Sequence, residues 1–233
     1  MNNEVVLVTG GNRGLGKAFV EEALARGARK VYAAARNPES VRTPGAIPLQ
    51  LDVTDPESVR RAAAIATDVT VLINNAGVSA RASVLNGDLD AIRQEFETNF
   101  YGTILVTRAF APILGAGGGG RILNVHSVLS WVSYGTSYSA TKAAVWQATN
   151  AFRLELAPQG TTVTGLHVGY VDTDMTADVD APKVAPQDVV REALDGVEAG
   201  AFEVLADDVT RTVKSALSSD GAALYPQLVP AGS

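Results

Sequence analysis

The sequence contains no cysteine, so it can form neither a disulfide bond nor a thiolate metal site. Its only two histidines, His126 and His167, come with no cluster of other metal ligands, so packing or local hydrogen bonding explains them better than a metal does. Asp172 and Asp174 are carboxylates that could bind a metal, but a solvated loop is the simpler interpretation. We therefore expect no metal site.

Positive charge and long apolar runs are also scarce. The 19 lysines and arginines are outnumbered by 25 aspartates and glutamates, and the net charge of −6 argues against a nucleic-acid surface. No apolar stretch approaches the ~20 residues of a transmembrane helix, and the N-terminus lacks the pattern of a signal peptide. We expect a cytoplasmic protein that binds neither nucleic acid nor membrane.

Apolar residues are abundant, at 46% of 233, which is enough for a large core. No repeat or linker divides the chain, so we predict one domain over residues 1–233. Strand patterns alternate with helix patterns throughout, and the strands are short and rich in Val, Ile and Leu, as in a parallel sheet buried on both faces. We expect strands within residues 4–9, 30–36, 46–52, 69–77, 121–127, 161–168 and 202–206. We expect helices at 15–26, 88–114, 137–156, 185–198 and 209–217, and a further one that Thr54 caps through its hydroxyl.

The stretch VTGGNRGLG joins the first strand to the first helix. Its glycines Gly10, Gly14 and Gly16 allow a sharp turn and a close approach of the backbone to a pyrophosphate, and the helix N-terminus offers N–H groups to the negative charge. A glycine-rich turn without a ligand is the alternative. A kinase-type P-loop is excluded, because no Gly-Lys-Ser/Thr ends the stretch.

Two arginines bear on the choice of cofactor. Arg36 ends the second strand, where an acidic residue would bind the ribose 2′-hydroxyl of NAD(H) and an arginine suits the 2′-phosphate of NADP(H). Arg13, inside the glycine loop, is a second candidate for that phosphate. Both could instead be ordinary surface arginines. Their positions predict that NADP(H) is preferred over NAD(H).

Tyr138 and Lys142 lie four residues apart at the start of an expected helix, so their side chains lie on one face. A free phenol has a pKa of about 10. A nearby positive charge lowers such a pKa by roughly 1–3 units and makes the phenol a usable proton donor and acceptor. The alternative is that both are ordinary surface residues.

Five motifs occur together in one order: Thr9-Gly10-x-x-x-Gly14-x-Gly16, Asn74-Asn75-Ala76-Gly77, Asn99, Ser127 and Tyr138-x-x-x-Lys142. With them the chain resembles a classical short-chain dehydrogenase/reductase over nearly its whole length. The resemblance implies a single doubly wound Rossmann-type α/β domain of about seven parallel strands in the order 3-2-1-4-5-6-7, with helices on both faces. It also implies a nicotinamide cofactor, a small carbonyl or alcohol substrate, and a homodimer or homotetramer.

The resemblance assigns roles to individual residues. Tyr138 is the general acid and base, Lys142 assists it and holds the nicotinamide ribose, Ser127 binds the substrate oxygen, and Asn99 orders a water in the proton path. The residues implied in cofactor binding are Gly10, Asn12, Arg13, Gly14, Leu15, Gly16, Arg36, Asp52, Val53, Asn75, Ala76, Gly77, Tyr138, Lys142, Gly169, Val171 and Thr173.

The chain departs from the family pattern at two places. Ser127 precedes Tyr138 by eleven residues where the family has thirteen, so Ser130 and Ser133 remain rival candidates. Val168-Gly169 stands where the family has Pro-Gly. Trp131, Tyr134 and Met175 flank the expected site, either as pocket residues or through ordinary packing.

The sequence therefore predicts an NADP(H)-dependent oxidoreductase of the carbonyl reductase or alcohol dehydrogenase type, which interconverts a ketone or aldehyde and an alcohol. Two alternatives stay open. One is a catalytically silent nucleotide-binding regulatory protein, and the other is a lyase or epimerase on the same fold. The short, polar segment 172–187 suggests an open site and broad specificity, but it does not identify the substrate.

Overall fold

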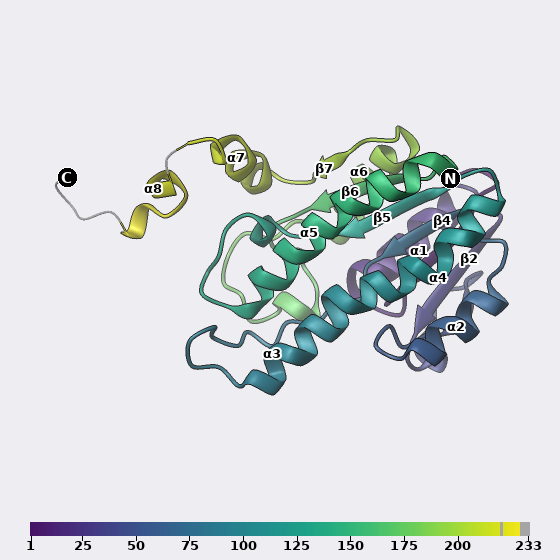
Figure 1. The fold of residues 1–233 in the computed structure, drawn as a ribbon, viewed down its shortest axis with the longest axis horizontal. Helices are drawn as coiled ribbons and strands as arrows, with labels where there is room; N and C mark the ends of the chain where they lie inside the picture. The colour runs from purple at the N-terminus through teal and green to yellow at the C-terminus, as the bar shows by residue number, and fades with distance from the viewer. Residues whose placement is uncertain (220, 229–233) are drawn as a thin grey trace.

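A computed structural model of the chain describes residues 1–219 and 221–228. One sheet of seven parallel strands runs through it in the order β3-β2-β1-β4-β5-β6-β7, which confirms the predicted topology (Figure 1). The strands are β1 (Val5–Thr9), β2 (Lys30–Ala35), β3 (Ile47–Gln50), β4 (Val71–Asn74), β5 (Arg121–Val125), β6 (Thr162–His167) and β7 (Glu203–Leu205). Because the strands are parallel, all their carboxyl ends lie at one edge.

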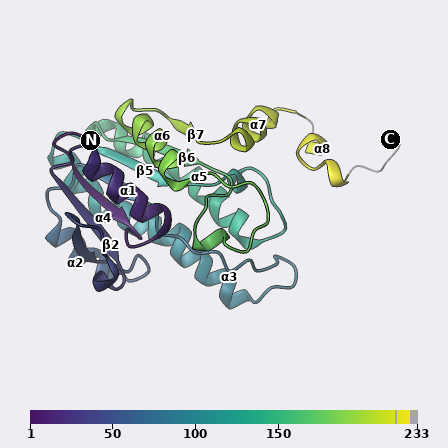
Figure 2. The same ribbon diagram turned by 180° about the vertical axis from the view of Figure 1, so that it is seen from behind.

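Helices cover both faces of the sheet, as predicted (Figures 1 and 2). The cluster of α1 and α6 packs on one face, and that of α2, α4 and α5 packs on the other. The longer helices are α1 (Gly14–Ala25), α2 (Pro56–Ile65), α3 (Leu89–Phe96), α4 (Gly102–Ala116), α5 (Ser137–Leu156), α6 (Pro186–Glu198) and α7 (Asp208–Ala216). Within the described residues, no helix is long and apolar enough to cross a membrane.

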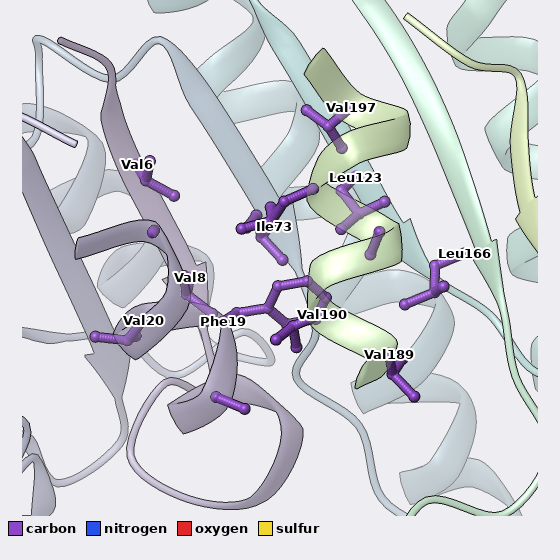
Figure 3. Packing of buried hydrophobic residues seen from close by; sticks show 14 of the residues in the cluster. Val6, Val8, Phe19, Val20, Ile73, Leu123, Leu166, Val189, Val190 and Val197 are labelled. Atoms are coloured by element: carbon purple, nitrogen blue, oxygen red, sulfur yellow. The ribbon is translucent and has the colours of Figure 1, made fainter. Parts of the chain in front are cut away.

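The core on the α1 and α6 face is built around Phe19. Figure 3 shows its ring between the sheet and α6, close to Val190. Phe19, Val190, Ile73 and Leu123 are all at most 1% exposed. The central strands β1 and β4 are buried along their whole length because both of their faces are covered, which explains why they read as continuous Val, Ile and Leu runs rather than as alternating patterns.

The helix expected over residues 88–114 is continuous in the structure but not uniform. Between α3 and α4 it contains a π-helical turn, Glu97–Tyr101. Such a turn inserts an extra residue and is frequent at functional sites. It changes the direction in which Asn99 points, and the sequence pattern gives no sign of it.

Two further details differ from the sequence expectations or extend them. The cap of α2 is Asp55, whose carboxylate accepts from the backbone N–H of Glu57, so the prediction of a Thr54 hydroxyl cap is wrong by one residue. Pro56 is the first residue of the helix, where its missing N–H costs nothing.

At the other end of the chain, α7 and α8 (Gly221–Leu224) extend from the β7 edge away from the sheet (Figures 1 and 2).

Replacing Phe19 by alanine should destabilise the protein by about 3–5 kcal/mol, because it removes a fully buried ring and leaves a cavity. Ile65→Ala on α2 is the control, since Ile65 is 64% exposed and its loss should change stability by less than about 0.5 kcal/mol. Urea unfolding followed by circular dichroism measures both. Similar free energies of unfolding for the two variants would contradict this description of the core.

Candidate active site

Hydrogen bonds between the Thr9–Gly16 motif and the Asn74–Gly77 motif join the carboxyl ends of β1 and β4. Nδ2 of Asn75 donates to the carbonyl oxygen of Thr9 at 2.9 Å. The hydroxyl of Thr9 accepts from the backbone N–H groups of Asn75 and Ala76, at 2.9 and 3.0 Å. These bonds fix the Asn74–Gly77 motif against the start of the glycine loop, so the structure brings the two motifs together.

The glycine loop forms a tight backbone turn before α1. Gly10 and Gly14 have φ values of 65° and 52°, a region that favours glycine. A β-carbon on Gly16 would lie only 2.1 Å from the carbonyl oxygen of Gly10, so no side chain fits there. No side chain caps the N-terminus of α1, whose N–H groups therefore remain available for an anion. A glycine-lined cradle with free N–H groups fits a dinucleotide pyrophosphate. Leu15, within the loop, packs against the core.

The polar residues around the loop differ in how they are held. Nδ2 of Asn12 donates to the Ser40 hydroxyl at 3.0 Å. Arg13, whose side chain is 69% exposed, lies 3.6 Å from an oxygen of Asp174. Arg36 is exposed at the end of β2, and no carboxylate within the described residues pairs with it. Arg36 is therefore the arginine with the more available charge.

Asp52 and Val53 follow β3 at the same edge of the sheet. One oxygen of Asp52 accepts from the backbone N–H and from the hydroxyl of Thr54, at 3.0 and 2.7 Å. Val53 is 8% exposed and packs so close to Gly102 that a β-carbon on the glycine would come within 2.8 Å of it. Both residues thus lie at the carboxyl edge of the sheet, and Thr54 bonds to only one of the two Asp52 oxygens.

Tyr138 and Lys142 occupy the first two turns of α5 and lie on one face, as their spacing predicts. Nζ of Lys142 lies 5.5 Å from the centroid of the Tyr138 ring. It donates a 2.7 Å hydrogen bond to the carbonyl oxygen of Val125, at the end of β5. Lys142 is only 5% exposed, so its ammonium is held inside the molecule rather than on the surface.

The electrostatics of this pair differ from the sequence expectation. Burial raises the pKa of Tyr138, and the negative charge of Glu95 raises it further. Burial lowers the pKa of Lys142 to about 8. Burial and Glu95, rather than Lys142, therefore dominate the pKa of Tyr138 in the structure. Burial drives both groups towards their neutral forms, because a low-dielectric environment disfavours charge.

Glu95 of α3 is a residue that the sequence interpretation missed. It is fully buried, and its two oxygens accept from the backbone N–H of Ala80 and from the hydroxyl of Ser137, the residue before Tyr138. It lies one helical turn before Asn99. This four-residue spacing from a predicted catalytic residue is the one feature of the sequence that could have pointed to Glu95. Without a structure, the same glutamate reads as one of several charges on an exposed helix face.

Asn99 lies in the π-helical turn and is 1% exposed. Its Oδ1 accepts from the backbone N–H of Val78, and its Nδ2 donates to the carbonyl of Val78 and to the hydroxyl of Thr141. Thr141 in turn donates to the carbonyl of Tyr138. Asn99 therefore joins the segment after Gly77 to the first turn of α5.

Among the three candidate serines, Ser127 lies nearest to the end of β5. It begins the short 3-10 turn Val128–Ser130, and its hydroxyl accepts from the N–H of Leu129 at 3.1 Å. Ser130 is buried, and its hydroxyl accepts from the N–H of Ser127. The Ser133 hydroxyl accepts from Gly135. Ser127 is thus the serine at the strand end, with Ser130 behind it.

The segment after β6 holds the last three predicted cofactor residues. The N–H of Gly169 donates to a carboxylate oxygen of Asp207, and Val171 forms an isolated bridge with Val184. Thr173 begins a 3-10 turn, and its side chain lies within 3.7 Å of where a β-carbon on Gly14 would be. The segment therefore reaches back to the glycine loop, and buried Val168 takes the place of the family's proline.

The remaining candidates separate into exposed and buried positions. Tyr134 and Met175 are 63% and 42% exposed, whereas Trp131 stacks on His167 with ring centroids 3.9 Å apart. His167 and His126 bond to each other at 3.1 Å. Among the described residues, no group of three or more potential ligands could hold a metal ion.

Comparisons with known proteins match most of the chain to one family. The family model for short chain dehydrogenases matches residues 4–183. A solved short chain dehydrogenase from Burkholderia cenocepacia J2315, in complex with NADP, is 41% identical with a TM-score of 0.93, over 99% of this chain and 100% of that one. Ketoacyl reductase HetN of Nostoc sp. is 32% identical over 88% of this chain and 79% of its own. The NADPH-dependent 1-acyldihydroxyacetone phosphate reductase of Schizosaccharomyces pombe is 36% identical over 72% of this chain and 60% of its own. With a family match over most of its length, the chain belongs to the short-chain dehydrogenase/reductase family of oxidoreductases.

Proposed function

We propose that the protein is an NADP(H)-dependent oxidoreductase that interconverts an aldehyde or ketone and an alcohol, with Tyr138 as general acid and base. The observation that carries the proposal is the buried ammonium of Lys142. It lies 5.5 Å from the Tyr138 ring and is bonded to Val125, two residues before Ser127. The phenol and the ammonium thus lie together at the carboxyl edge of the sheet, where Ser127 follows β5.

Each residue has a distinct part in the proposed reduction. When bound, NADPH supplies a hydride to the carbonyl carbon of the substrate. Tyr138 donates its proton to the substrate oxygen, and Ser127 donates a hydrogen bond to the same oxygen. The positive charge of Lys142 stabilises the phenolate that Tyr138 leaves behind. The raised pKa of Tyr138 keeps the phenol protonated until a substrate arrives.

The cofactor preference is part of the proposal. The exposed Arg36 supports recognition of the 2′-phosphate of NADP(H), and the NADP complex of the Burkholderia relative and the NADPH dependence of the yeast reductase agree with it. Gly10, Gly14 and Gly16 bind the pyrophosphate, Asn75 to Gly77 bind the adenosine side, and Gly169 to Thr173 contact the nicotinamide. We further propose a cytoplasmic homodimer or homotetramer, as the family resemblance implies, with α5, on which Leu154 is 79% exposed, as one of the helices at the subunit interface.

Tyr138→Phe should lower turnover of an accepted carbonyl substrate about 10²–10⁴-fold, because it removes only the transferable proton. NADPH affinity should change less than about two-fold, since the ring remains. Lys142→Ala should lower both turnover and affinity. Steady-state kinetics and fluorescence titration of NADPH measure the two effects. A Tyr138→Phe variant with near wild-type turnover would show that the proton comes from another group.

The rate of carbonyl reduction at saturating NADPH should fall as the pH rises through about 8. Lys142 has a pKa lowered to about 8, so it is charged below that pH and neutral above it, and only the charged form stabilises the phenolate. Tyr138 keeps its proton over this range because its pKa is raised. The residual rate of Lys142→Met should not vary between about pH 7 and pH 9, because methionine has no charge to lose. A wild-type rate constant over the same range would refute the assignment.

Arg36→Ala should weaken NADPH binding about 10–100-fold and leave NADH binding nearly unchanged, because it removes one charged hydrogen bond to the 2′-phosphate. Arg29→Ala is the matched control: Arg29 is also exposed, but it precedes β2 at the opposite, amino end of the same strand. Isothermal titration with each cofactor measures the effect. An equal loss of NADPH and NADH affinity in Arg36→Ala would exclude recognition of the phosphate by Arg36.

A further inference from the structure

A group of ring and charged side chains, built on two buried histidines, contacts the turn that begins at Ser127 and has no part in the reaction proposed above. We call His126, His167, Trp131, Glu203 and Lys214 the histidine cluster. The two histidines are 2% and 0% exposed, and their rings meet edge to face at 4.6 Å. The cluster draws its members from the segment after β5, the turn after Ser127, β6, β7 and α7, so it joins elements that are far apart in the chain.

A chain of hydrogen bonds runs from α5 through both rings to the backbone of Ser127. Oγ1 of Thr149 lies 2.8 Å from Nε2 of His126, and Nδ1 of His126 lies 3.1 Å from Nε2 of His167. Nδ1 of His167 lies 3.2 Å from the carbonyl oxygen of Ser127. A carbonyl oxygen can only accept, so Nδ1 of His167 carries a hydrogen and donates it to Ser127.

The hydrogen on Nδ1 of His167 determines where the other hydrogens in this series of hydrogen bonds lie. Burial is the largest influence on the pKa of both histidines and lowers it, while the Glu203 carboxylate, 3.5 Å from Nε2 of His167, acts on His167 in the opposite direction. Because burial outweighs the carboxylate, we assign both rings as neutral. His167 therefore accepts at Nε2 from Nδ1–H of His126, and His126 accepts at Nε2 from the hydroxyl of Thr149. The carbonyl of Val145, 2.8 Å from that hydroxyl, competes for its proton. With this assignment, every ring nitrogen of the two histidines has a partner.

Charged and aromatic contacts link the same ring to α7. Trp131 stacks on His167 with an interplanar angle of 16°. Nζ of Lys214 lies 4.8 Å from the centroid of the Trp131 ring, within range for a cation–π contact. Glu203 holds Lys214 in that position through a 2.6 Å bond and accepts from the indole N–H of Trp146 at 3.0 Å. Lys214 thus connects α7 to the turn that follows Ser127.

We propose that His167 is a positioning residue for Ser127, and that Lys214 keeps His167 in place through Trp131. The inference rests on the proposed role of Ser127 in holding the substrate oxygen. The Ser127 carbonyl is fixed by hydrogen bonds from the N–H of Ser130 and from His167. The hydroxyl accepts from Leu129 and keeps its own proton for a substrate. The two hydrogen bonds to the Ser127 carbonyl fix the backbone and therefore the direction in which the hydroxyl proton points. Misplacement of a reacting group by about 1 Å can lower a rate about 100-fold.

Two substitutions separate the contact to Ser127 from the rest of the cluster. His167→Asn keeps an N–H at the place of Nδ1, whereas His167→Gln can replace only Nε2. We expect His167→Gln to lower kcat/KM for a carbonyl substrate about 10-fold and His167→Asn to recover most of that loss. NADPH affinity should stay within about two-fold in both, since the cluster does not touch the glycine loop. Equal activities for the two variants would overturn the proposal.

A double-mutant cycle shows whether the effect passes through Ser127. His167→Gln should cost about 10-fold in the wild-type background and less than about two-fold in a Ser127→Ala background. Equal costs in both backgrounds would show that His167 acts elsewhere, which overturns the proposal. Full activity of Ser127→Ala alone would instead contradict the proposed function of that serine, so the two failures are distinguishable.

Hydrogen exchange tests the same link without any turnover. We expect His167→Gln and Lys214→Met to raise the exchange rate of backbone amides in residues 127–131 at least about five-fold, because both remove support for that turn. Arg211→Met is the matched control, since Arg211 is also a cation on α7 but its ion pairs within the described part of the chain are with Asp208 and Glu192. Unchanged exchange in Lys214→Met, or an equal rise in Arg211→Met, would overturn the link to α7. The hydrogen-exchange measurement tests the proposal even if the wild-type protein reduces no carbonyl compound.

Discussion

The hydrogen bonds between Thr9 and Asn75 hold together the ends of β1 and β4, where the sheet changes its direction of winding. Segments that leave these two strands diverge, which is why ligands of such sheets bind at this point. The glycine loop follows β1 directly, and the segment after β4 is held by Asn99. Because all strands are parallel, β5 and β6 deliver Ser127 and Gly169 to the same edge. The site is therefore assembled by the sheet rather than by any single loop.

Burial of charge governs the chemistry at that edge. Lys142 and Glu95 are both buried, and both lie within the surroundings of Tyr138. In such a low-dielectric space, a change of charge on one group is felt strongly by the others. The Val125 carbonyl compensates part of the cost of the Lys142 ammonium, and Ser137 and Ala80 compensate that of the Glu95 carboxylate. The site thus depends on backbone and hydroxyl partners as much as on its charged groups.

The fold was predictable from the sequence because buried parallel strands, glycine turns and helix patterns are local signals. The shared face of Tyr138 and Lys142 came from their spacing, whereas the order of the seven strands came from the family resemblance. The π-helical turn at Asn99, the Asp55 cap and the burial of Glu95 were not predictable. Each depends on tertiary packing, which decides between conformations that the local sequence permits almost equally. Neither histidine showed in the sequence that it contacts the other, since His126 follows β5 and His167 ends β6, about forty residues further along the chain.

The chain has only two tryptophans, and both lie beside Lys214, with ring centroids 4.8 and 5.6 Å from its Nζ. The two indoles also meet edge to face at 6.3 Å. Tryptophan fluorescence from this protein therefore originates at one place, next to the turn that begins at Ser127. The molecule therefore carries its own optical probe of the contact between α7 and the turn that begins at Ser127.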